Sequence, residues 1–134
     1  PEDIRRHIAE GTRAGLCYVG SGDGIDDRFS AIAGLLVRNF IRARYMTVGT
    51  VLDGLGDGSL PDLSCVLIPN FFVPSAFGGG IAKWQVSALY DFLLDRKARG
   101  QQSIIYVADL NALGKEYGLP MKNLIQSSYE IVEA

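Results

Sequence analysis

Hydrophobic and polar positions follow two periodicities along the chain, and their alternation predicts strands and helices in turn. Short apolar runs bounded by glycine or polar residues are typical of strands buried in a sheet. Longer segments with apolar residues three and four positions apart predict amphipathic helices. The expected strands cover residues 15–19, 45–48, 64–68, 103–107 and 129–132. The expected helices cover residues 2–10, 26–44, 50–55, 81–99, 111–117 and 120–126.

The order of these elements predicts an α/β fold. Strands that alternate with helices form a mostly parallel sheet, and the helices then cover both of its faces in a three-layer arrangement. A chain of 134 residues is long enough for one domain, and it shows neither an internal repeat nor a domain boundary. We therefore expect residues 1–134 to form a single domain.

The helix expected over residues 26–44 carries the clearest apolar stripe, and Asp26 or Asp27 is its expected N-cap. The helix expected over residues 81–99 should turn its apolar side chains toward the sheet. These inward residues are Trp84, Ala88, Leu89, Phe92 and Leu93.

Composition is typical of globular proteins, with 48% hydrophobic and 21% charged residues. No apolar run is long enough to cross a bilayer, and the first residues lack the features of a signal peptide, so we expect a cytoplasmic protein. Cys17 and Cys65 lie in apolar runs and are interpreted as small buried side chains in a reducing compartment, rather than as a disulfide or a metal site. His7 has no Cys or His at ligand spacing, and we expect it on a solvated helix face.

Two groups of basic residues lie near the ends of the long helices, while the formal net charge of the chain is −2. A slightly acidic chain is not expected to coat nucleic acid by charge alone. Cations near helix C-termini complement the helix dipole, which suffices to explain both groups. Weak or indirect DNA contact through the first group stays open as an alternative. The groups are Arg38, Arg42 and Arg44, and Arg96, Lys97 and Arg99.

A glycine-rich turn, Gly20–Gly24, joins the first strand to the long helix, which is where α/β proteins commonly bind phosphate. The P-loop pattern G-x-x-x-x-G-K-[ST] begins at Gly20 but has Ile25 at its second glycine. Asp26 then stands in place of the lysine and Asp27 in place of the hydroxyl residue. The dinucleotide pattern G-x-G-x-x-G fails at Ile25 as well. This degenerate phosphate loop comprises Gly20, Ser21, Gly22, Asp23, Gly24, Ile25, Asp26 and Asp27.

The aspartates of this turn replace attraction for phosphate by repulsion. Two like charges about 4 Å apart repel by roughly 4 kcal/mol at an effective dielectric constant near 20. Asp23 adds a third negative charge to the turn. The three carboxylates lack the spacing of a calcium loop, and acidic residues in a first helical turn are common for dipole reasons. We therefore expect neither ATP, nor Mg²⁺, nor another metal or cofactor in this turn.

Three segments of the sequence, residues 11–20, 45–53 and 89–105, resemble the AAA+ ATPases of the bacterial DnaC-type helicase loaders and transposition helper proteins. They look like that family's first strand and loop, its strand and helix after the P-loop helix, and its helix leading into the sensor strand. The resemblance covers nearly the whole chain. It implies a P-loop NTPase-like AAA+ fold, side-by-side assembly, and partners in DNA replication, recombination or transposition.

Several positions depart from the chemistry of that family. Its second acidic motif, which supports magnesium and activates water, matches Pro69 and Asn70, and neither carries a carboxylate. The family's sensor asparagine matches Asp109. Ser127 and Ser128 stand about where the family has an arginine that reaches a neighbour's nucleotide. Because the lysine, the hydroxyl and both acids are missing together, the sequence predicts a catalytically inactive pseudo-ATPase.

The leading hypothesis for the function is an interaction or assembly module, whose partners are other proteins or further copies of the chain. Phe71, Phe72 and Phe77 stand in an expected glycine-rich loop over residues 69–80 and are the candidate contact residues. Phe71 and Phe72 can equally well cover the end of the sheet.

Two further hypotheses stay open. A nucleotide-binding or small-ligand-binding protein, or a weak ATPase, would use the backbone donors of the Gly20–Gly24 loop in a non-standard way. Tyr18, Asn70, Tyr106 and Asp109 would then lie around that cleft, although ordinary packing at strand ends also explains them. A nucleic-acid adaptor would instead use the arginines of residues 38–44.

Overall fold

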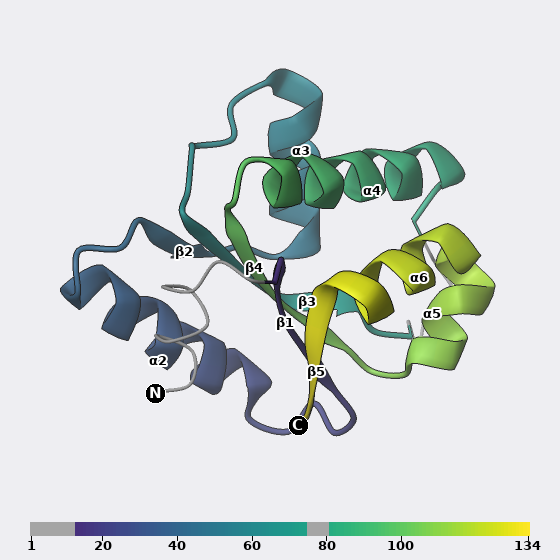
Figure 1. Ribbon diagram of the computed structural model, residues 1–134, viewed down its shortest axis with the longest axis horizontal. Coiled ribbons are helices and arrows are strands. Elements are labelled where there is room, and N and C mark those ends of the chain that lie inside the picture. Colours follow the sequence, from purple (N-terminus) through teal and green to yellow (C-terminus); the bar gives the residue numbers. More distant parts are fainter. Residues whose placement is uncertain (1–12, 75–80) are drawn as a thin grey trace.

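The computed structural model describes residues 13–74 and 81–134, which form a five-stranded sheet in the order β2-β3-β4-β1-β5 (Figure 1). Every strand pair in this part of the chain is parallel. The expected α/β class with a parallel sheet is therefore confirmed. The helix expected over residues 2–10, with His7, lies outside the described residues. The strands are β1 (Gly15–Val19), β2 (Ala43–Tyr45), β3 (Cys65–Phe72), β4 (Gln102–Val107) and β5 (Tyr129–Glu133).

Helices cover both faces of the sheet and produce the expected three layers (Figure 1). On one face, Phe29 and Leu36 of α2 pack in a cluster with Leu16 and Leu67 of the strands. The other face packs against α3, α4, α5 and α6 in a second, larger cluster. The central strands are buried on both sides, which is why they read as continuous apolar runs. The helices are α2 (Ile25–Arg38), α3 (Val48–Asp57), α4 (Lys83–Ala98), α5 (Leu110–Tyr117) and α6 (Leu119–Ser128).

Helix α2 is shorter than the apolar spacing predicts, because the chain reverses after Arg38 instead of continuing to residue 44. Phe40 has a left-handed backbone conformation, with φ 63°. Its N–H donates to the Val37 carbonyl at 3.0 Å, and the Ile41 N–H reaches back to Leu36 at 3.0 Å. These bonds satisfy the last carbonyls of the helix in the manner of a C-terminal cap that usually contains glycine.

The early end of α2 moves the second strand toward the N-terminus. Ala43 pairs with Cys65 and Tyr45 with Leu67, so β2 begins two residues before the expected strand over residues 45–48. Thr47 is not part of the strand. Its side chain accepts the Thr50 N–H at 3.2 Å and is the N-cap of α3.

The expectation that Trp84 points inward was wrong, because 69% of its surface is exposed. The buried stripe of α4 consists of Leu89, Leu93 and Arg96. At 100° per residue, Trp84 lies about 140° around the helix from Leu89 and so faces away from the sheet.

Arg96 is buried, with 4% of its surface exposed, although its position near a helix end predicts only a complement to the helix dipole. Its guanidinium donates to Ser103 Oγ at 2.9 Å, to the Leu63 carbonyl at 3.0 Å and to the Gln102 carbonyl at 2.5 Å. A fourth bond, of 3.2 Å, reaches Gln101 Oε1. Burial lowers the pKa of Arg96. This one side chain ties α4 to β4 and to the segment before β3.

Arg96→Ala should lower the free energy of unfolding by roughly 2–4 kcal/mol, because it leaves buried carbonyl and hydroxyl groups without a donor. Urea unfolding followed by circular dichroism measures this change. Arg99→Ala, which breaks only an exposed 3.1 Å pair with Asp95, is the control and should cost less than about 1 kcal/mol. Equal losses in the two variants would contradict the structural role of Arg96.

Cys17 and Cys65 should resist alkylation in the folded protein. Both are free and fully buried, and burial raises the pKa of each thiol to about 12, so almost no thiolate exists at neutral pH. Mass spectrometry after iodoacetamide treatment should show no label under native conditions and two labels after urea unfolding. Rapid labelling of the folded protein would show that one thiol is accessible.

Candidate functional site

The Gly20–Gly24 turn leaves the carboxyl end of β1 and closes on its own atoms. The Ile25 N–H donates to the Gly22 carbonyl at 3.2 Å. The Asp23 N–H donates to Ser21 Oγ at 3.3 Å. Backbone N–H groups are what a phosphate-binding loop offers to its anion. Two of those donors are already occupied within the turn.

Helix α2 is capped by Gly24 and not by an aspartate, so the expected N-cap at Asp26 or Asp27 was wrong. Gly24 has φ 75°, a conformation that glycine adopts without strain. The Arg28 N–H donates to its carbonyl at 2.9 Å, which starts the helical hydrogen bonding earlier than expected. Both aspartates lie in the first turn, where their charges favour the helix dipole.

Tyr106 of β4 forms a hydrogen bond to the turn. The register between β1 and β4 places Tyr106 opposite Tyr18. Its hydroxyl donates to the Gly20 carbonyl, and a Cβ at residue 22 would lie 3.2 Å from that hydroxyl. Burial, and to a smaller degree the charge of Asp23, raise the pKa of Tyr106, so the hydroxyl keeps its proton and remains a donor. The sequence indicates Tyr106 only as a residue at a strand end.

Carboxylates lie on the exposed side of the turn, at Asp23, Asp26 and Asp27. Tyr45 of β2 donates its hydroxyl to Asp26 Oδ1 at 3.1 Å. Burial, this hydrogen bond and the charges of Asp26 and Asp27 raise the pKa of Tyr45. Within residues 13–74 and 81–134, no Lys or Arg forms an ion pair with the three aspartates. A phosphate approaching this turn therefore meets three exposed carboxylates. No sequence signal pointed to Tyr45.

Pro69 and Asn70, at the positions of the acidic motif, lie inside β3 and not in a loop as expected. The pairing of β3 with β4 is irregular between Ile68 and Phe72. Proline has no N–H for the sheet, so it is tolerated at such an irregularity. Asn70 Oδ1 accepts the Val48 N–H at 2.8 Å and caps the first turn of α3. Asn70, which matches the family's water-activating acid, thus has a structural partner.

Asp109, at the sensor position, caps α5. Its Oδ1 accepts the Asn111 N–H at 2.7 Å and the Ala112 N–H at 3.1 Å. This is the ordinary use of aspartate at a helix N-terminus. Asp109 performs this capping role without a bound nucleotide.

Phe71 and Phe72 belong to the core, which contradicts their prediction as contact residues of a loop. Both lie in β3 with at most 2% of their surface exposed. Each ring packs edge-on against Tyr117, with centroids 6.0 and 5.1 Å apart. The Tyr117 hydroxyl also donates to the Phe71 carbonyl at 3.0 Å. The third candidate, Phe77, lies outside the described residues.

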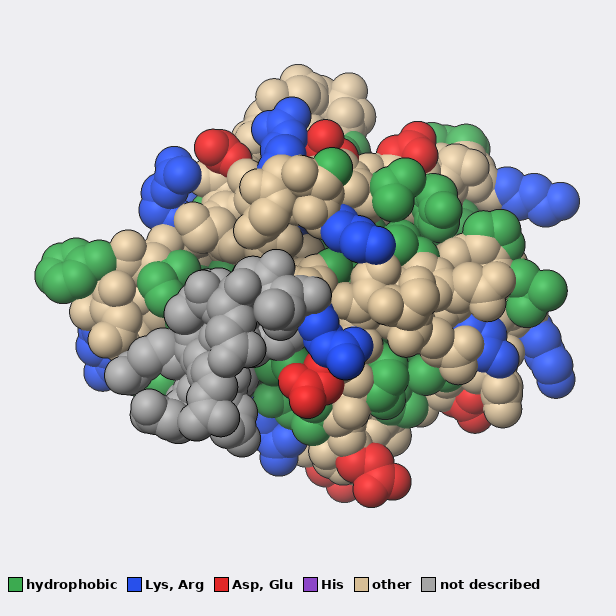
Figure 2. Space-filling model, in the orientation of Figure 1, with side chains coloured by type: hydrophobic (Ala, Val, Ile, Leu, Met, Phe, Trp, Pro, Cys, Tyr) green, Lys and Arg blue, Asp and Glu red, His purple; other side chains and the backbone are tan. Residues whose placement is uncertain are grey.

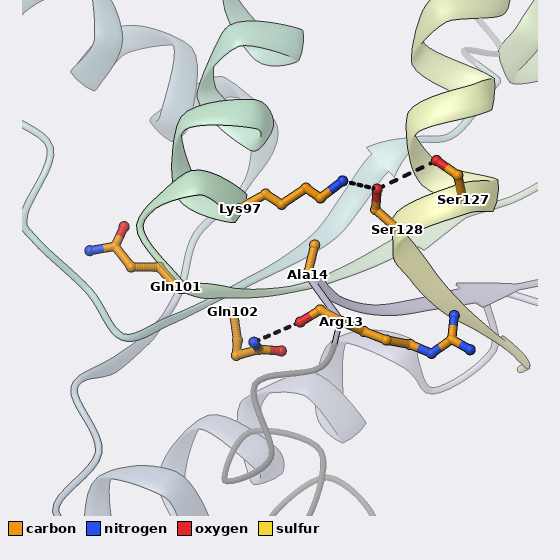
Figure 3. A pocket seen from close by; sticks show the side chains of 8 residues that line it. Arg13, Ala14, Lys97, Gln101, Gln102, Ser127 and Ser128 are labelled. Atoms are coloured by element: carbon orange, nitrogen blue, oxygen red, sulfur yellow. Dashed lines mark hydrogen bonds between the residues drawn. The ribbon is translucent and has the colours of Figure 1, made fainter.

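Ser127 and Ser128 lie at the end of α6, at the amino edge of the sheet and away from the turn. With Lys97 and other residues they line a cavity of about 460 Å³ (Figure 3). Lys97 Nζ donates to Ser128 Oγ at 2.8 Å, and the two serine hydroxyls are 3.5 Å apart. Lys97 points toward the serines, whereas the side chains of Arg13 and Gln101 point away from them (Figure 3). The structure does not bring these serines to the phosphate loop of the same chain.

The three arginines expected near the end of α2 have different surroundings. Arg38 donates through Nε to the Gly34 carbonyl at 3.3 Å. Arg42 lies 3.7 Å from Asp62 in an exposed pair. Arg44 is exposed on the edge strand β2. They form an exposed basic segment that begins with the last residue of α2.

Two kinds of site are not found among the described residues. In residues 13–74 and 81–134, no group of three or more His, Cys, Asp or Glu side chains is placed to hold a metal ion. No helix in the same ranges is long and apolar enough to cross a membrane.

Comparison with known structures identifies the architecture. DnaA from Aquifex aeolicus, bound to AMPPCP, matches with a TM-score of 0.71 and 13% identity over 98% of this chain. The DnaC helicase loader matches with a TM-score of 0.65 and 16% identity over 98% of this chain and 86% of its own. Domain III of DnaA from Thermotoga maritima gives a TM-score of 0.64 at 13% identity, over 98% of this chain and 59% of that one.

The fold is that of the DnaA and DnaC AAA+ domains. The AAA+ resemblance seen in the sequence is confirmed at the level of the fold. The chain spans less than half of the Aquifex DnaA chain, 44% of its length. No protein-family model matches the sequence, and no curated protein does.

Asn70→Ala should lower the free energy of unfolding by about 1 kcal/mol, because the Val48 N–H at the start of α3 loses its acceptor. Asn70→Asp keeps an acceptor oxygen at that position and is the matched control. Chemical denaturation at neutral pH compares the two. A loss as large in the aspartate variant as in the alanine variant would contradict the capping role.

Proposed function

We propose that this chain is an AAA+-like domain that does not hydrolyse ATP and that serves as an interaction or assembly module in DNA replication or a related DNA transaction. The observation that carries the proposal is that side chains in and around the expected nucleotide site form hydrogen bonds within the chain. Asn70 caps α3, Asp109 caps α5, and Tyr106 holds the Gly20 carbonyl.

The positions that match the family's lysine, hydroxyl and acidic residues lack the groups that hydrolysis uses. An ATPase needs a cation for the phosphates, a ligand for magnesium and a group that orients or deprotonates water. Asp26 and Asp27 supply negative charge at the first two positions. Asn70 cannot take a proton from water, and its carbonyl oxygen is occupied by Val48. The aspartates cannot replace the missing lysine, since their charge repels the phosphates of the substrate.

The association with replication is supported by the names of the structural neighbours. One is a DnaA replication initiator bound to AMPPCP and single-stranded DNA, and another is the DnaC helicase loader. With identities of 11% and 16%, these neighbours share the fold, so their biological context is an inference for this chain. A domain can retain this fold without the catalytic groups. Its surfaces then remain available for contacts with other proteins or with further copies of the chain.

Isothermal titration with ATP and ADP, with and without magnesium, together with a phosphate-release assay, tests the proposal. The wild-type chain should give neither heat of binding nor turnover. Asp26→Lys combined with Asp27→Thr restores the missing cation and hydroxyl. This variant should gain measurable nucleotide binding but no hydrolysis, because Pro69 and Asn70 still provide no acid.

Magnesium-dependent hydrolysis by the wild-type chain, abolished by substitutions at Gly22 and Gly24, would refute the proposal. Nucleotide binding without turnover would instead support the alternative in which the Gly20–Gly24 loop holds a nucleotide or small ligand in a non-standard way. Measuring the heat of binding and the released phosphate on the same sample distinguishes hydrolysis from binding without turnover.

A further inference from the structure

The sheet ends at β5, and the outer edge of this strand is open. β5 pairs with β1 on one side, and no strand in the part of the chain that the structure describes pairs with its other side. The Ala134 N–H, directly after the strand, donates to the Val19 carbonyl of β1 at 2.8 Å. Because backbone groups alternate in direction along a strand, Ile131 and Glu133 turn their N–H and C=O groups away from β1. These groups are the ones that an added strand would use.

An apolar cleft of about 640 Å³ lies beside this edge, between β5 and α2. Its apolar wall consists of Ala31, Ile32 and Leu35 of α2 and Val132 of β5. Leu35 and Val132 are only half-buried, and Ala31 is exposed. Among the described residues, no strand beyond β5 lies beneath this flank of α2. A further strand at the open edge would cover these side chains.

The cleft carries more positive than negative charge. Arg28 and Arg38 of α2 line it, together with Glu133 of β5. The Arg28 guanidinium lies 5.8 Å from the centre of the Tyr18 ring, and both arginines are exposed. Neither arginine forms an ion pair with a carboxylate of the described residues. Two cations against one carboxylate favour an occupant that carries negative charge.

The positions of the two arginines set the spacing of that negative charge. Arg28 and Arg38 both belong to α2, and ten residues of an α-helix rise about 15 Å. In an extended segment, positions i and i+4 share a face and lie about 14 Å apart. Acids at these two positions can each reach one arginine, while residue i+2 lies against the apolar wall. The pattern is the same in both chain directions, so a parallel or an antiparallel strand can carry it.

Charge also argues against a second copy of the chain as the occupant. Two β5 strands paired edge to edge would bring Glu130 and Glu133 of one copy close to the same residues of the other. Both glutamates are exposed, and like charges on paired strands are destabilising. Figure 2 shows an Asp or Glu side chain beside hydrophobic side chains in the region where β5 runs in Figure 1. The edge therefore suits a segment of a different protein.

We propose that the β5 edge and the α2–β5 cleft together bind an extended segment of a partner protein, which adds a strand to the sheet. The segment carries an acid, an apolar residue and an acid at alternate positions. Hydrogen bonds to the backbone of Ile131 and Glu133 supply affinity, and the arginines and the apolar wall supply specificity. The inference names a class of partner for the interaction role proposed above and rests on that role.

Fluorescence anisotropy of a labelled peptide, titrated with the full chain, tests the contact. The probe has the sequence Ser-Glu-Val-Leu-Val-Glu-Ser, and the same peptide with lysine in place of both glutamates is its control. Wild-type protein should bind the acidic peptide at least about tenfold more tightly than the lysine peptide. A chain with Arg28→Glu and Arg38→Glu should reverse this preference. Because both arginines are exposed, circular dichroism of this variant should show a wild-type fold.

Backbone changes on both sides of the contact make the test specific for an added strand. Alternate N–H groups of a strand point to the same side, so methylation of the leucine nitrogen or of a valine nitrogen in the probe should affect binding differently. Loss with N-methyl leucine indicates a parallel strand, and loss with N-methyl valine an antiparallel one. Ile131→Pro removes an N–H that points away from β1 and should weaken binding about tenfold. Ile131→Ala keeps this N–H and is the matched control.

A wild-type chain that does not bind the acidic peptide up to its solubility limit would overturn the proposal, as would equal losses with the two methylated peptides. Sedimentation velocity gives the competing outcome. Dimers of the wild-type chain that disappear in Ile131→Pro would overturn the partner and identify a second copy as the occupant of the edge. ATP turnover by a chain that still binds the peptide would refute the proposed loss of catalysis and leave the contact intact.

Discussion

The pairing of β1 with β4 is the contact on which both the sheet and the candidate site depend. Gly15 lies opposite Ser103 so closely that a Cβ at residue 15 would stand 1.7 Å from the Ser103 carbonyl oxygen. Only glycine allows this approach. The same register carries Tyr106 to the end of β4 beneath Gly20. A slip of one residue would turn Tyr106 to the opposite face of the sheet and leave the turn without its support.

In the candidate site, side chains at the positions that match the family's nucleotide-binding residues take part in hydrogen bonds of the fold itself. The positions that hold nucleotide in an active P-loop protein lie at helix starts and strand ends, where backbone N–H groups need acceptors. Here Asn70 and Asp109 supply those acceptors to α3 and α5. These two side chains therefore stabilise the starts of α3 and α5.

The two edges of the sheet differ in charge. At the carboxyl edge, Asp23, Asp26 and Asp27 are exposed without an ion pair in the described part of the chain. At the amino edge, Arg96 is buried and bonded to carbonyl and hydroxyl groups, with Lys97 beside it. A buried cation is tolerated only when its donors are satisfied, as they are here. Arg96 thus holds α4, β4 and the segment before β3 together at the amino edge.

The sequence by itself determined the class of fold, and it also revealed where the turn departs from the P-loop pattern. Apolar periodicity reports local backbone geometry, so the alternation of strands and helices was visible without tertiary contacts. The substitutions at Ile25, Asp26 and Asp27 were equally visible, because the P-loop pattern is a short contiguous motif.

Tertiary structure alone decided where elements end and which side chains are buried. Phe40 ends α2 with a left-handed turn, although its apolar spacing continues the helix pattern. Phe71 and Phe72 extend β3 past Pro69 because Tyr117, 45 or more residues away in the sequence, covers them. Arg96 is buried because its acceptors lie on separate segments that only the fold brings together. Burial depends on neighbours distant in the chain, and a local pattern carries no information about which neighbours those are.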